Sequence, residues 1–399
     1  MKKKILIISS SYPFGKHETF LENEINYLSK FFDLHVIPMY KNKESDVARK
    51  VPNNLTYSVP ILKTNQLKRF LNGVFNRAPL FINSSEIFRL FKDSETIIKS
   101  LYQLYVNFIN FRSLLSNKNF SYALQNSKID VVYFYWANAP VKSINSCKPI
   151  YIRIHGGEIY KDRNNGYIAF DKLKFISSTN ITYLPISEIA ANHVHDYSPS
   201  IKYIINRLGV YDKGLNPNEN LDFIRIVSCS TLIALKRVNL IIESLSLINN
   251  TKVEWIHFGD GPLQDVLENQ ASKLGDNIKI CFKGRVSNEE VLSYYNKNHI
   301  NLFVNVSQTE GVPVSVMEAL SFGIPCFATN VGGTSEIIDN SVGKLVDKHF
   351  KLMELVNFIE ETGKVKMMSS KRIAARNRWN ELSNAKKNYG QLVDIYYCK

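Results

Sequence analysis

Two glutamates, Glu310 and Glu318, stand eight positions apart in one short segment and could bind the hydroxyl groups of a ligand. A carboxylate can accept paired hydrogen bonds from two neighbouring hydroxyls. Pro313 lies between them and suits the first position of a helix, where its missing N–H would have no partner anyway. The backbone N–H groups around Gly311 and Val312 would then lie at a helix N-terminus, which stabilises a bound phosphate. The segment predicts a site for a ligand with phosphate and hydroxyl groups, whereas each glutamate by itself could equally be a solvated or locally paired residue.

Four further positions in the second half of the chain suit the same ligand. Lys236 stands at the start of the predicted helix 236–249, where a cation could lie beside a phosphate or be an ordinary surface lysine. Gly259 and Gly261 belong to the turn Gly-Asp-Gly-Pro, and glycines let the backbone come close to a ligand. Arg285 opens the next loop.

The first half of the chain offers two candidates. Gly15 follows the first predicted strand and could allow a close approach of the backbone, or it could belong to an ordinary turn. His155 follows another predicted strand and could hydrogen-bond hydroxyls or donate to a developing charge. The pattern Gly-x-Gly-x-x-Gly does not follow the first strand, which disfavours dinucleotide-dependent oxidoreductases. No metal-binding motif is found in the sequence, so we expect neither a metal nor a cofactor.

Short β-branched runs alternate with helical patterns along the chain, which is typical of parallel sheets covered by helices. In the first half, strands are expected at 4–10, 34–38, 131–136, 150–154, 181–185 and 203–206. In the second half, strands are expected at 224–230, 253–259, 278–283, 300–306, 325–329 and 344–346, and helices at about 236–249, 262–274, 287–297 and 313–322. The sequence predicts an α/β chain of two Rossmann-like, doubly wound domains that face each other across a cleft.

The domain boundary is expected in the polar, turn-rich stretch 209–222. This gives an N-terminal domain at 1–210, with a basic helical insertion at about 60–128. A C-terminal domain follows at 223–370, and we expect the helical segment 371–399 to pack back on the N-terminal domain.

Composition narrows the class of protein. With 399 residues, 45% hydrophobic and 22% charged, the chain suits two globular domains. Its five cysteines are scattered and odd in number, which indicates a reduced, cytoplasmic chain without a disulfide framework. No stretch approaches the ~20 apolar residues of a membrane span.

The net charge of +14 is partly concentrated in the basic insertion, where ten Lys and Arg residues stand against three acidic residues. Aromatic and aliphatic residues interleave with these charges, so two interpretations are open. The insertion could lie on an anionic membrane surface, or its apolar faces could pack inward as ordinary helices. No nucleic-acid-binding motif accompanies the charge, and we expect no nucleic-acid partner.

The spacing Glu-x7-Glu, followed by Ala-x3-Gly-x-Pro at 319–325, resembles the signature of the retaining glycosyltransferases of family 4, which have the GT-B fold. The resemblance covers most of residues 205–350. It implies that Glu310 contacts the transferred sugar, that Glu318 holds the ribose hydroxyls and that Lys236 lies on the diphosphate of a nucleotide-sugar donor. It also implies a donor-binding role for Arg285, which would line the nucleobase pocket.

Two positions depart from the family pattern. Thr231 stands where members often carry an arginine, which puts a second diphosphate cation in doubt. Lys16 replaces the usual second glycine of the loop around Gly15.

The resemblance implies a transferase of cell-surface polysaccharide biosynthesis, for example of capsule or lipopolysaccharide. Its N-terminal domain would bind a glycan or polyprenyl-linked acceptor, and the chain would be cytoplasmic or peripheral on the inner face of the cell membrane. The alternatives are a sugar-nucleotide epimerase and a non-catalytic GT-B partner subunit. The donor sugar, the base, the linkage and the oligomeric state do not follow from the sequence.

Overall fold

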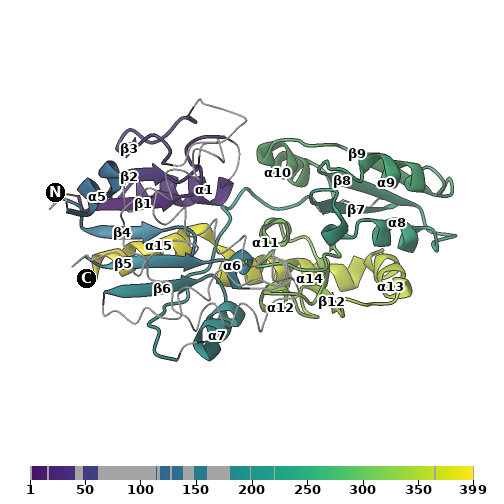
Figure 1. Cartoon of the computed structure of the whole chain (residues 1–399). Coiled ribbons are helices and arrows are strands. Elements are labelled where there is room, and N and C mark those ends of the chain that lie inside the picture. The colour runs from purple at the N-terminus through teal and green to yellow at the C-terminus, as the bar shows by residue number, and fades with distance from the viewer. Residues whose placement is uncertain are drawn as a thin grey trace, which may run out of the picture. The chain divides into compact units, whose positions relative to one another are not determined.

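The computed structural model describes residues 2–15, 18–40, 48–61, 114, 117–125, 128–137, 148–159, 180–197, 199–219, 221–363 and 365–398. It divides into two compact units. The first unit is Met1–Asn206 with Tyr389–Lys399, and the second unit is Arg207–Asn388. Each unit is built on one six-stranded sheet (Figure 1).

The sheet of the first unit is entirely parallel, with the strand order β3-β2-β1-β4-β5-β6. The strands are β1 (Lys4–Ser9), β2 (Asp33–Pro38), β3 (Leu55–Tyr57), β4 (Val131–Phe134), β5 (Ile150–Ile154) and β6 (Ile181–Pro185). Strand β1 pairs with both β2 and β4, so Ile5 lies opposite Leu34 on one side and Val131 on the other. The strand order reverses at this point, between β1 and β4.

Helices cover both faces of the first sheet. They are α1 (Thr19–Leu28), α5 (Lys118–Gln125), the short α6 (Gly156–Ile159), α7 (Glu188–Tyr197) and the end of α15 (Ala385–Tyr397). Ile5 and Ile7 pack with α1 and α15 on one face, whereas Leu6 and Ile8 pack with α5 and α7 on the other. This alternation follows from the two-residue period of a strand.

The second unit repeats the same strand order, as β12-β11-β10-β7-β8-β9, again all parallel. The strands are β7 (Ile224–Cys229), β8 (Val253–Phe258), β9 (Ile278–Phe282), β10 (Leu302–Asn305), β11 (Cys326–Thr329) and β12 (Gly343–Val346). Here the order reverses between β7 and β10. In a doubly wound sheet, ligands bind beside the carboxyl ends of the strands at this switch point.

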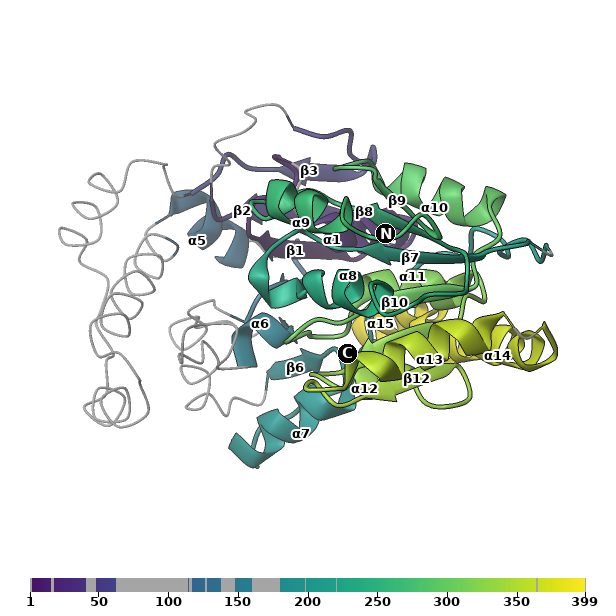
Figure 2. The same ribbon diagram turned by 90° about the vertical axis from the view of Figure 1, so that its right-hand side faces the viewer.

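The helices of the second unit also form two layers, which Figure 2 shows from the side. They are α8 (Asn239–Leu245), α9 (Gln264–Ala271), α10 (Asn288–Lys297), α11 (Val314–Ser321), α12 (Thr334–Ile337), α13 (Leu352–Thr362) and α14 (Val365–Arg378). Helices α8, α9 and α13 share one core with the sheet. On the other face, Tyr295 of α10 contacts Phe303 of β10 and Phe322, which directly follows α11.

The predicted α/β fold with two Rossmann-like domains is confirmed, and eleven of the twelve predicted strands are found. The prediction of a strand at 203–206 is wrong, because Tyr203 makes only an isolated bridge to Tyr183. The short edge strand β3 was not predicted, since three residues give too little alternation to recognise.

The predicted boundaries can be compared with the two units. The stretch 209–222, predicted as a linker, lies inside the second unit. Of the predicted C-terminal segment 371–399, only Tyr389–Lys399 belongs to the first unit. Most of the predicted basic insertion at 60–128 falls outside the described residues. No helix among the described ranges is long and apolar enough to cross a membrane.

Candidate functional site

The switch point of the second unit brings Lys236 and Glu310 together across 74 positions of sequence. Their Nζ and Oε1 atoms lie 2.6 Å apart. Lys236 follows β7 and Glu310 follows β10, and these two strands are neighbours in the sheet. The carboxyl ends of parallel strands meet at one sheet edge, so the topology explains the contact.

The backbone around Lys236 is fixed by its neighbour Arg237. Lys236 ends a 3₁₀ turn, and Arg237 takes a left-handed conformation with φ of 48°, which is uncommon for any residue but glycine. Its guanidinium donates to the carbonyl oxygens of Val306 (2.8 Å), Ser307 (3.3 Å) and Lys348 (2.5 Å). Arg237 therefore ties the loop after β7 to the end of β10 and does not replace Lys236 as a cation at the site.

Glu310 is buried in a loop that packs tightly against a second loop. Its Oε1 also accepts a hydrogen bond of 3.4 Å from the Asn305 side chain. A Cβ atom at Gly332 would lie 1.9 Å from the carbonyl oxygen of Glu310, and one at Gly333 would lie 2.7 Å from a methyl group of Val312. Only glycines fit at this contact, which fixes the path of the chain at Glu310.

Helix α11 begins one residue later than predicted. Pro313 is its N-cap, with extended backbone, and the first i to i−4 bond runs from Met317 N–H to the Pro313 carbonyl. The first-turn N–H groups, at Val314 to Val316, therefore precede the intrahelical bonds. The other end agrees with the prediction, because Gly323 follows the C-cap residue Phe322 and takes φ of 71°. Gly323 N–H bonds to Leu320 and the next N–H bonds to the carbonyl of Ala319, which is a Schellman motif.

Glu318 lies inside α11 with 7% of its surface exposed. Its Oε1 accepts a hydrogen bond of 2.7 Å from Nδ2 of Asn288, the first residue of α10. Burial raises the pKa of the Glu318 carboxyl to about 7, and the Asn288 hydrogen bond opposes this shift. The predicted glutamate pair thus differs in partners, since Glu310 faces a cation and Glu318 a neutral amide.

The remaining predicted residues of the second unit lie in loops at the carboxyl ends of β8 and β9. Gly259 has φ of 135°, and a Cβ there would lie 1.9 Å from the carbonyl oxygen of Ser230. A Cβ at Gly261 would lie 2.5 Å from the carbonyl oxygen of Leu232. These glycines bring the loop after β8 against the loop after β7. Arg285 is exposed in the loop between β9 and α10.

The first unit places its own carboxylate at its switch point, and no sequence pattern predicted it. Glu18 is the N-cap of α1 and has a left-handed backbone with φ of 61°. Its carboxylate accepts the Trp136 indole N–H at 2.6 Å and three backbone N–H groups, from Ser10 (2.8 Å), Ser11 (2.7 Å) and Tyr12 (2.8 Å). The amides that directly follow β1 therefore already hold an anion from the chain itself.

Gly15 lies in the same loop, with φ of 72°, and its carbonyl oxygen accepts a hydrogen bond of 2.5 Å from Arg49 Nε. The left-handed backbone explains the glycine at this position. Its approach to a ligand stays a prediction.

His155 is a buried residue that follows β5 directly. Its Nε2 lies 3.0 Å from the carbonyl oxygen of Tyr135, and because that oxygen only accepts, Nε2 carries the proton in this contact. The ring lies against Trp136, with centroids 4.5 Å apart and planes at 38°. Glu158, which the sequence analysis did not single out, accepts hydrogen bonds from the backbone N–H of His155 (2.8 Å) and of Ala137 (3.2 Å). Trp136 thus joins His155 to Glu18.

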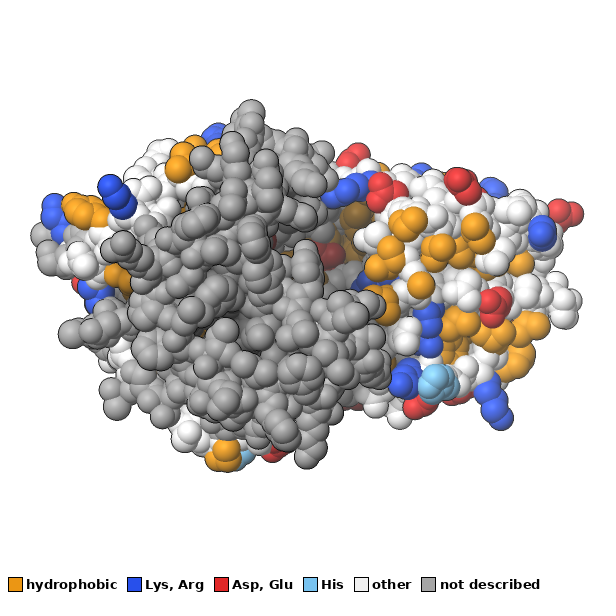
Figure 3. All heavy atoms as spheres, viewed as in Figure 1, with side chains coloured by type: hydrophobic (Ala, Val, Ile, Leu, Met, Phe, Trp, Pro, Cys, Tyr) orange, Lys and Arg blue, Asp and Glu red, His pale blue; other side chains and the backbone are white. Residues whose placement is uncertain are grey.

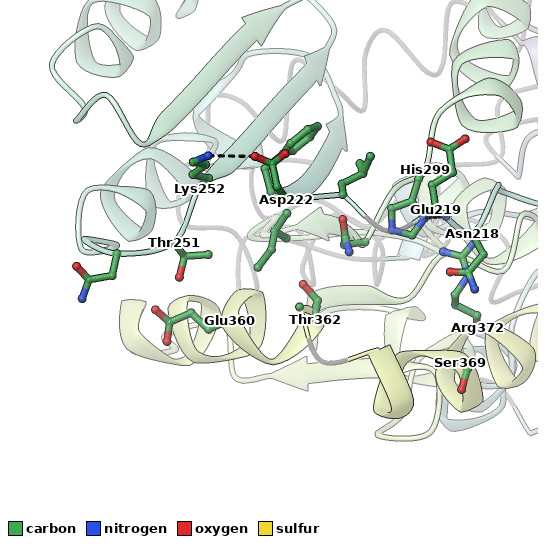
Figure 4. Close-up of a pocket in the computed structure, with 16 residues that line it drawn as sticks. Asn218, Glu219, Asp222, Thr251, Lys252, His299, Glu360, Thr362, Ser369 and Arg372 are labelled. Carbon is green, nitrogen blue, oxygen red and sulfur yellow. Dashed lines mark hydrogen bonds and ion pairs between the residues drawn. The ribbon is translucent and has the colours of Figure 1, made fainter.

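A separate cavity of about 740 Å³ opens at the amino edge of the second sheet (Figure 4). Phe223, Lys252 and Asn301, which directly precede or begin strands β7, β8 and β10, line it. Lys252 forms an exposed ion pair of 3.0 Å with Asp222, and Arg372 donates to backbone carbonyls of the segment before β7. The cavity is therefore at the opposite edge from Lys236 and Glu310 and is not part of the same site.

Among the residues that the structure describes, no group of three or more His, Cys, Asp and Glu side chains is placed to hold a metal ion. His257, one of the histidines in the second unit, contacts Ser228 Oγ at 2.8 Å and the Ser230 carbonyl at 3.0 Å. Burial lowers the pKa of His257 to about 4. It is a neutral core residue.

Comparison with known proteins agrees with this architecture. Residues 216–378 match the family described as Glycosyl transferases group 1. Protein CapJ of Staphylococcus aureus is 28% identical over 263 residues, which cover 57% of this chain and 66% of CapJ. The uncharacterized glycosyltransferase MJ1178 of Methanocaldococcus jannaschii is 31% identical over 169 residues, or 40% of this chain and 46% of the relative. The chain thus matches less than two thirds of the length of these relatives.

Solved structures resemble the chain over nearly its full length. Sucrose-phosphate synthase from Thermosynechococcus elongatus has a TM-score of 0.68 at 13% identity and covers 99% of this chain and 98% of its own. The lipopolysaccharide outer core galactosyltransferase WaaB has a TM-score of 0.66 at 14% identity, covering 98% and 99%. Anabaena HepE in complex with UDP-glucose has a TM-score of 0.65 at 14% identity, covering 99% and 100%. Residues 216–378 thus match the glycosyltransferase group 1 family, and the solved structures show that the chain has the GT-B fold.

Proposed function

We propose that this chain is a retaining glycosyltransferase that moves a sugar from a nucleotide-diphosphate sugar to a glycan or lipid-linked acceptor. The observation that carries the proposal is the contact of Lys236 with Glu310 at the switch point, next to the first turn of α11. A cation and the first-turn amides of a helix suit a diphosphate, and a buried carboxylate suits the hydroxyls of the transferred sugar.

In the reaction, the bond between the anomeric carbon and the diphosphate oxygen breaks, and a bond to the acceptor oxygen forms. Among the residues that carry the resemblance, none is a carboxylate expected to act as a nucleophile under the sugar. We therefore propose that the acceptor attacks from the face that the diphosphate leaves, and that its proton passes to the departing phosphate. Lys236 and the first-turn amides of α11 would stabilise the charge that grows on that phosphate. Glu310 would orient the sugar.

Two further positions would hold the nucleotide, and a third would contact the sugar. Glu318 would accept the ribose hydroxyls, and the exposed Arg285 would lie beside the base. His155, which is held in the first unit by Tyr135 and Trp136, would contact the sugar. We propose a uridine nucleotide as the first candidate, because the solved structure of HepE contains UDP-glucose.

Two experiments test the donor. Thermal shifts with UDP, GDP, ADP and CDP should identify the base, since a ligand that binds only the folded state raises the melting temperature. The matching nucleotide sugars should then be hydrolysed slowly by the purified chain, with release of the nucleoside diphosphate. A chain that no nucleotide stabilises, or that releases none, would contradict the proposal and favour a non-catalytic subunit.

We further propose that no divalent ion is required, because Lys236 and the α11 amides would neutralise the diphosphate. Turnover should persist in EDTA. Loss of activity in EDTA, restored by magnesium or manganese, would overturn this part of the proposal.

We propose a role in cell-surface polysaccharide biosynthesis at a membrane surface. Support comes from the similarity to CapJ and WaaB and from the basic charge of the chain. On the face of the second unit that Figure 3 shows, acidic and basic side chains are mixed and apolar side chains lie between them, so the basic charge there is not gathered in one patch. Flotation with anionic liposomes should depend on salt and on the segment 60–128, which holds ten Lys and Arg residues. Absence of flotation at low salt would count against it.

A further inference from the structure

Helix α10 presents the side chain of its first residue, Asn288, to a carboxylate on another helix. Nδ2 of Asn288 donates to Oε1 of Glu318 at 2.7 Å. The other oxygen of Glu318 accepts no hydrogen bond from any residue that the structure describes. This oxygen is also not one of the buried side-chain atoms that lack a partner, so solvent reaches it. One oxygen of Glu318 is therefore held by the protein, and the other is accessible.

Among the residues that the structure describes, no positively charged group is in contact with Glu318. Cys229, at the end of β7, and Tyr295, on α10, interact electrostatically with Glu318. Burial raises the pKa of the Cys229 thiol to about 12 and that of Tyr295 well above its usual value, so both are neutral. Cys326, also buried and neutral, interacts electrostatically with Tyr295. Lys236 pairs with Glu310 instead. The Asn288 amide is thus the polar group that offsets the burial of Glu318 in this neighbourhood.

The backbone of Asn288 is fixed independently of its side chain. Ser287 and Glu290 form a capping box that holds the first turn of α10. Just before it, Gly284 has φ of 64°, and its carbonyl oxygen accepts the N–H of Gly259 at 2.9 Å. Arg285 lies between these two fixed points. The loop proposed to meet the base and the amide that contacts Glu318 are therefore parts of one turn that is hydrogen-bonded at both ends.

We propose that Asn288 is a positioning residue, which holds one oxygen of the Glu318 carboxylate and turns the other toward the ribose hydroxyls of the donor. This inference rests on the proposed function, in which Glu318 binds the ribose. A hydrogen bond to the charged form of a carboxyl also favours that form, so Asn288 keeps Glu318 in the state that accepts two hydroxyls.

The test replaces the amide without disturbing the fold. Asn288 is exposed, and its helix cap depends on other side chains, so Asn288→Ala should fold normally. The matched control is Asn296→Ala on the same helix, because Asn296 is also exposed and donates only to the Lys213 carbonyl among the described residues.

The first measurement needs no ligand. Protein labelled with ¹³C at the glutamate carboxyl carbon is titrated by NMR, and the Glu318 signal is identified by its loss in Glu318→Gln. We expect its midpoint in Asn288→Ala to rise by about one pH unit, because a hydrogen bond to a charged group is lost. The midpoint in Asn296→Ala should equal that of the unmodified chain.

The second measurement is the affinity for UDP-glucose by calorimetry at pH 6 and pH 8. This probe is chosen because its diphosphate is esterified at both ends and does not titrate in that range. We expect Asn288→Ala to bind about three- to tenfold more weakly than the control at pH 6, and the gap to narrow at pH 8.

The outcomes separate the two proposals. An unchanged Glu318 midpoint or an unchanged affinity in Asn288→Ala would overturn the positioning role. If the midpoint moves but Glu318→Gln binds UDP-glucose as well as the unmodified chain, the hydrogen bond is upheld and the ribose assignment of the proposed function fails.

Discussion

The two units share one strand order, and each places a carboxylate at its switch point, but the two carboxylates have opposite surroundings. In the first unit Glu18 is clamped by three backbone N–H groups and by the Trp136 indole. In the second unit Glu310 pairs with the flexible Lys236 side chain. Backbone donors cannot move to a ligand, whereas a lysine side chain can change partner. From this comparison we expect the first switch point to stabilise a loop and, on the proposed function, the second one to exchange partners with a substrate.

The largest loss of activity should follow from a change to the ion pair of Lys236 and Glu310. Glu310→Gln keeps the shape of the side chain but removes its charge, so Lys236 loses its partner and the sugar loses a strong acceptor. We expect the release of nucleoside diphosphate to fall by about a thousandfold, with a similar circular dichroism spectrum. Glu254→Gln is the control, because Glu254 forms a comparable 2.5 Å ion pair with Arg225 away from the site. Near-normal turnover in Glu310→Gln would remove the catalytic assignment.

Lys236→Ala should cause the second-largest loss of activity. If Lys236 stabilises the departing diphosphate, kcat should fall by about a hundredfold while KM changes little. The steady-state constants of Lys252→Ala, a lysine whose exposed ion pair lies at the opposite sheet edge, should stay unchanged. A rise in KM at constant kcat would instead indicate simple binding of the substrate by Lys236.

Removal of the Glu18 carboxylate should lower the stability of the folded chain. Glu18→Ala leaves three backbone donors and one indole donor without their anion. We expect the free energy of unfolding to drop by about 2–3 kcal/mol, measured by denaturant titration with tryptophan fluorescence. Glu22→Ala, which breaks a partly exposed ion pair with Arg49, should cost about 1 kcal/mol or less. Equal losses of unfolding free energy in the two variants would show that the hydrogen bonds to Glu18 stabilise the chain no more than a partly exposed ion pair does.

A smaller effect should depend on pH. The Glu318 carboxyl has a pKa of about 7 in the folded chain, against an ordinary value of 4.5. The folded state therefore holds its proton more tightly, and the second unit loses stability as pH rises from about 4.5 to 7. Glu318→Gln abolishes this loss, so it should stabilise the chain by about 1–3 kcal/mol at pH 8 and by almost nothing at pH 4.5. Thermal unfolding at the two pH values checks this, and a difference of the opposite sign would contradict it.

The sequence by itself determined the fold class and most of the strands, and it predicted a site in the second unit. Hydrophobic periodicity depends only on neighbouring residues, and so do the start of α11 near Pro313 and its end at Gly323. The spacing of Glu310 and Glu318 is likewise local. A glycine such as Gly259 indicates a place where two backbone segments come close together.

Only the tertiary structure decided which groups meet. Lys236 reaches Glu310, Asn288 reaches Glu318 and Trp136 reaches Glu18 because strands or helices that are distant in sequence become neighbours. No local pattern marks Asn288 or Glu18, since a polar residue at a helix start is ordinary in either case. Their roles arise from burial and from the parallel sheet, which collects the ends of separate segments at one edge.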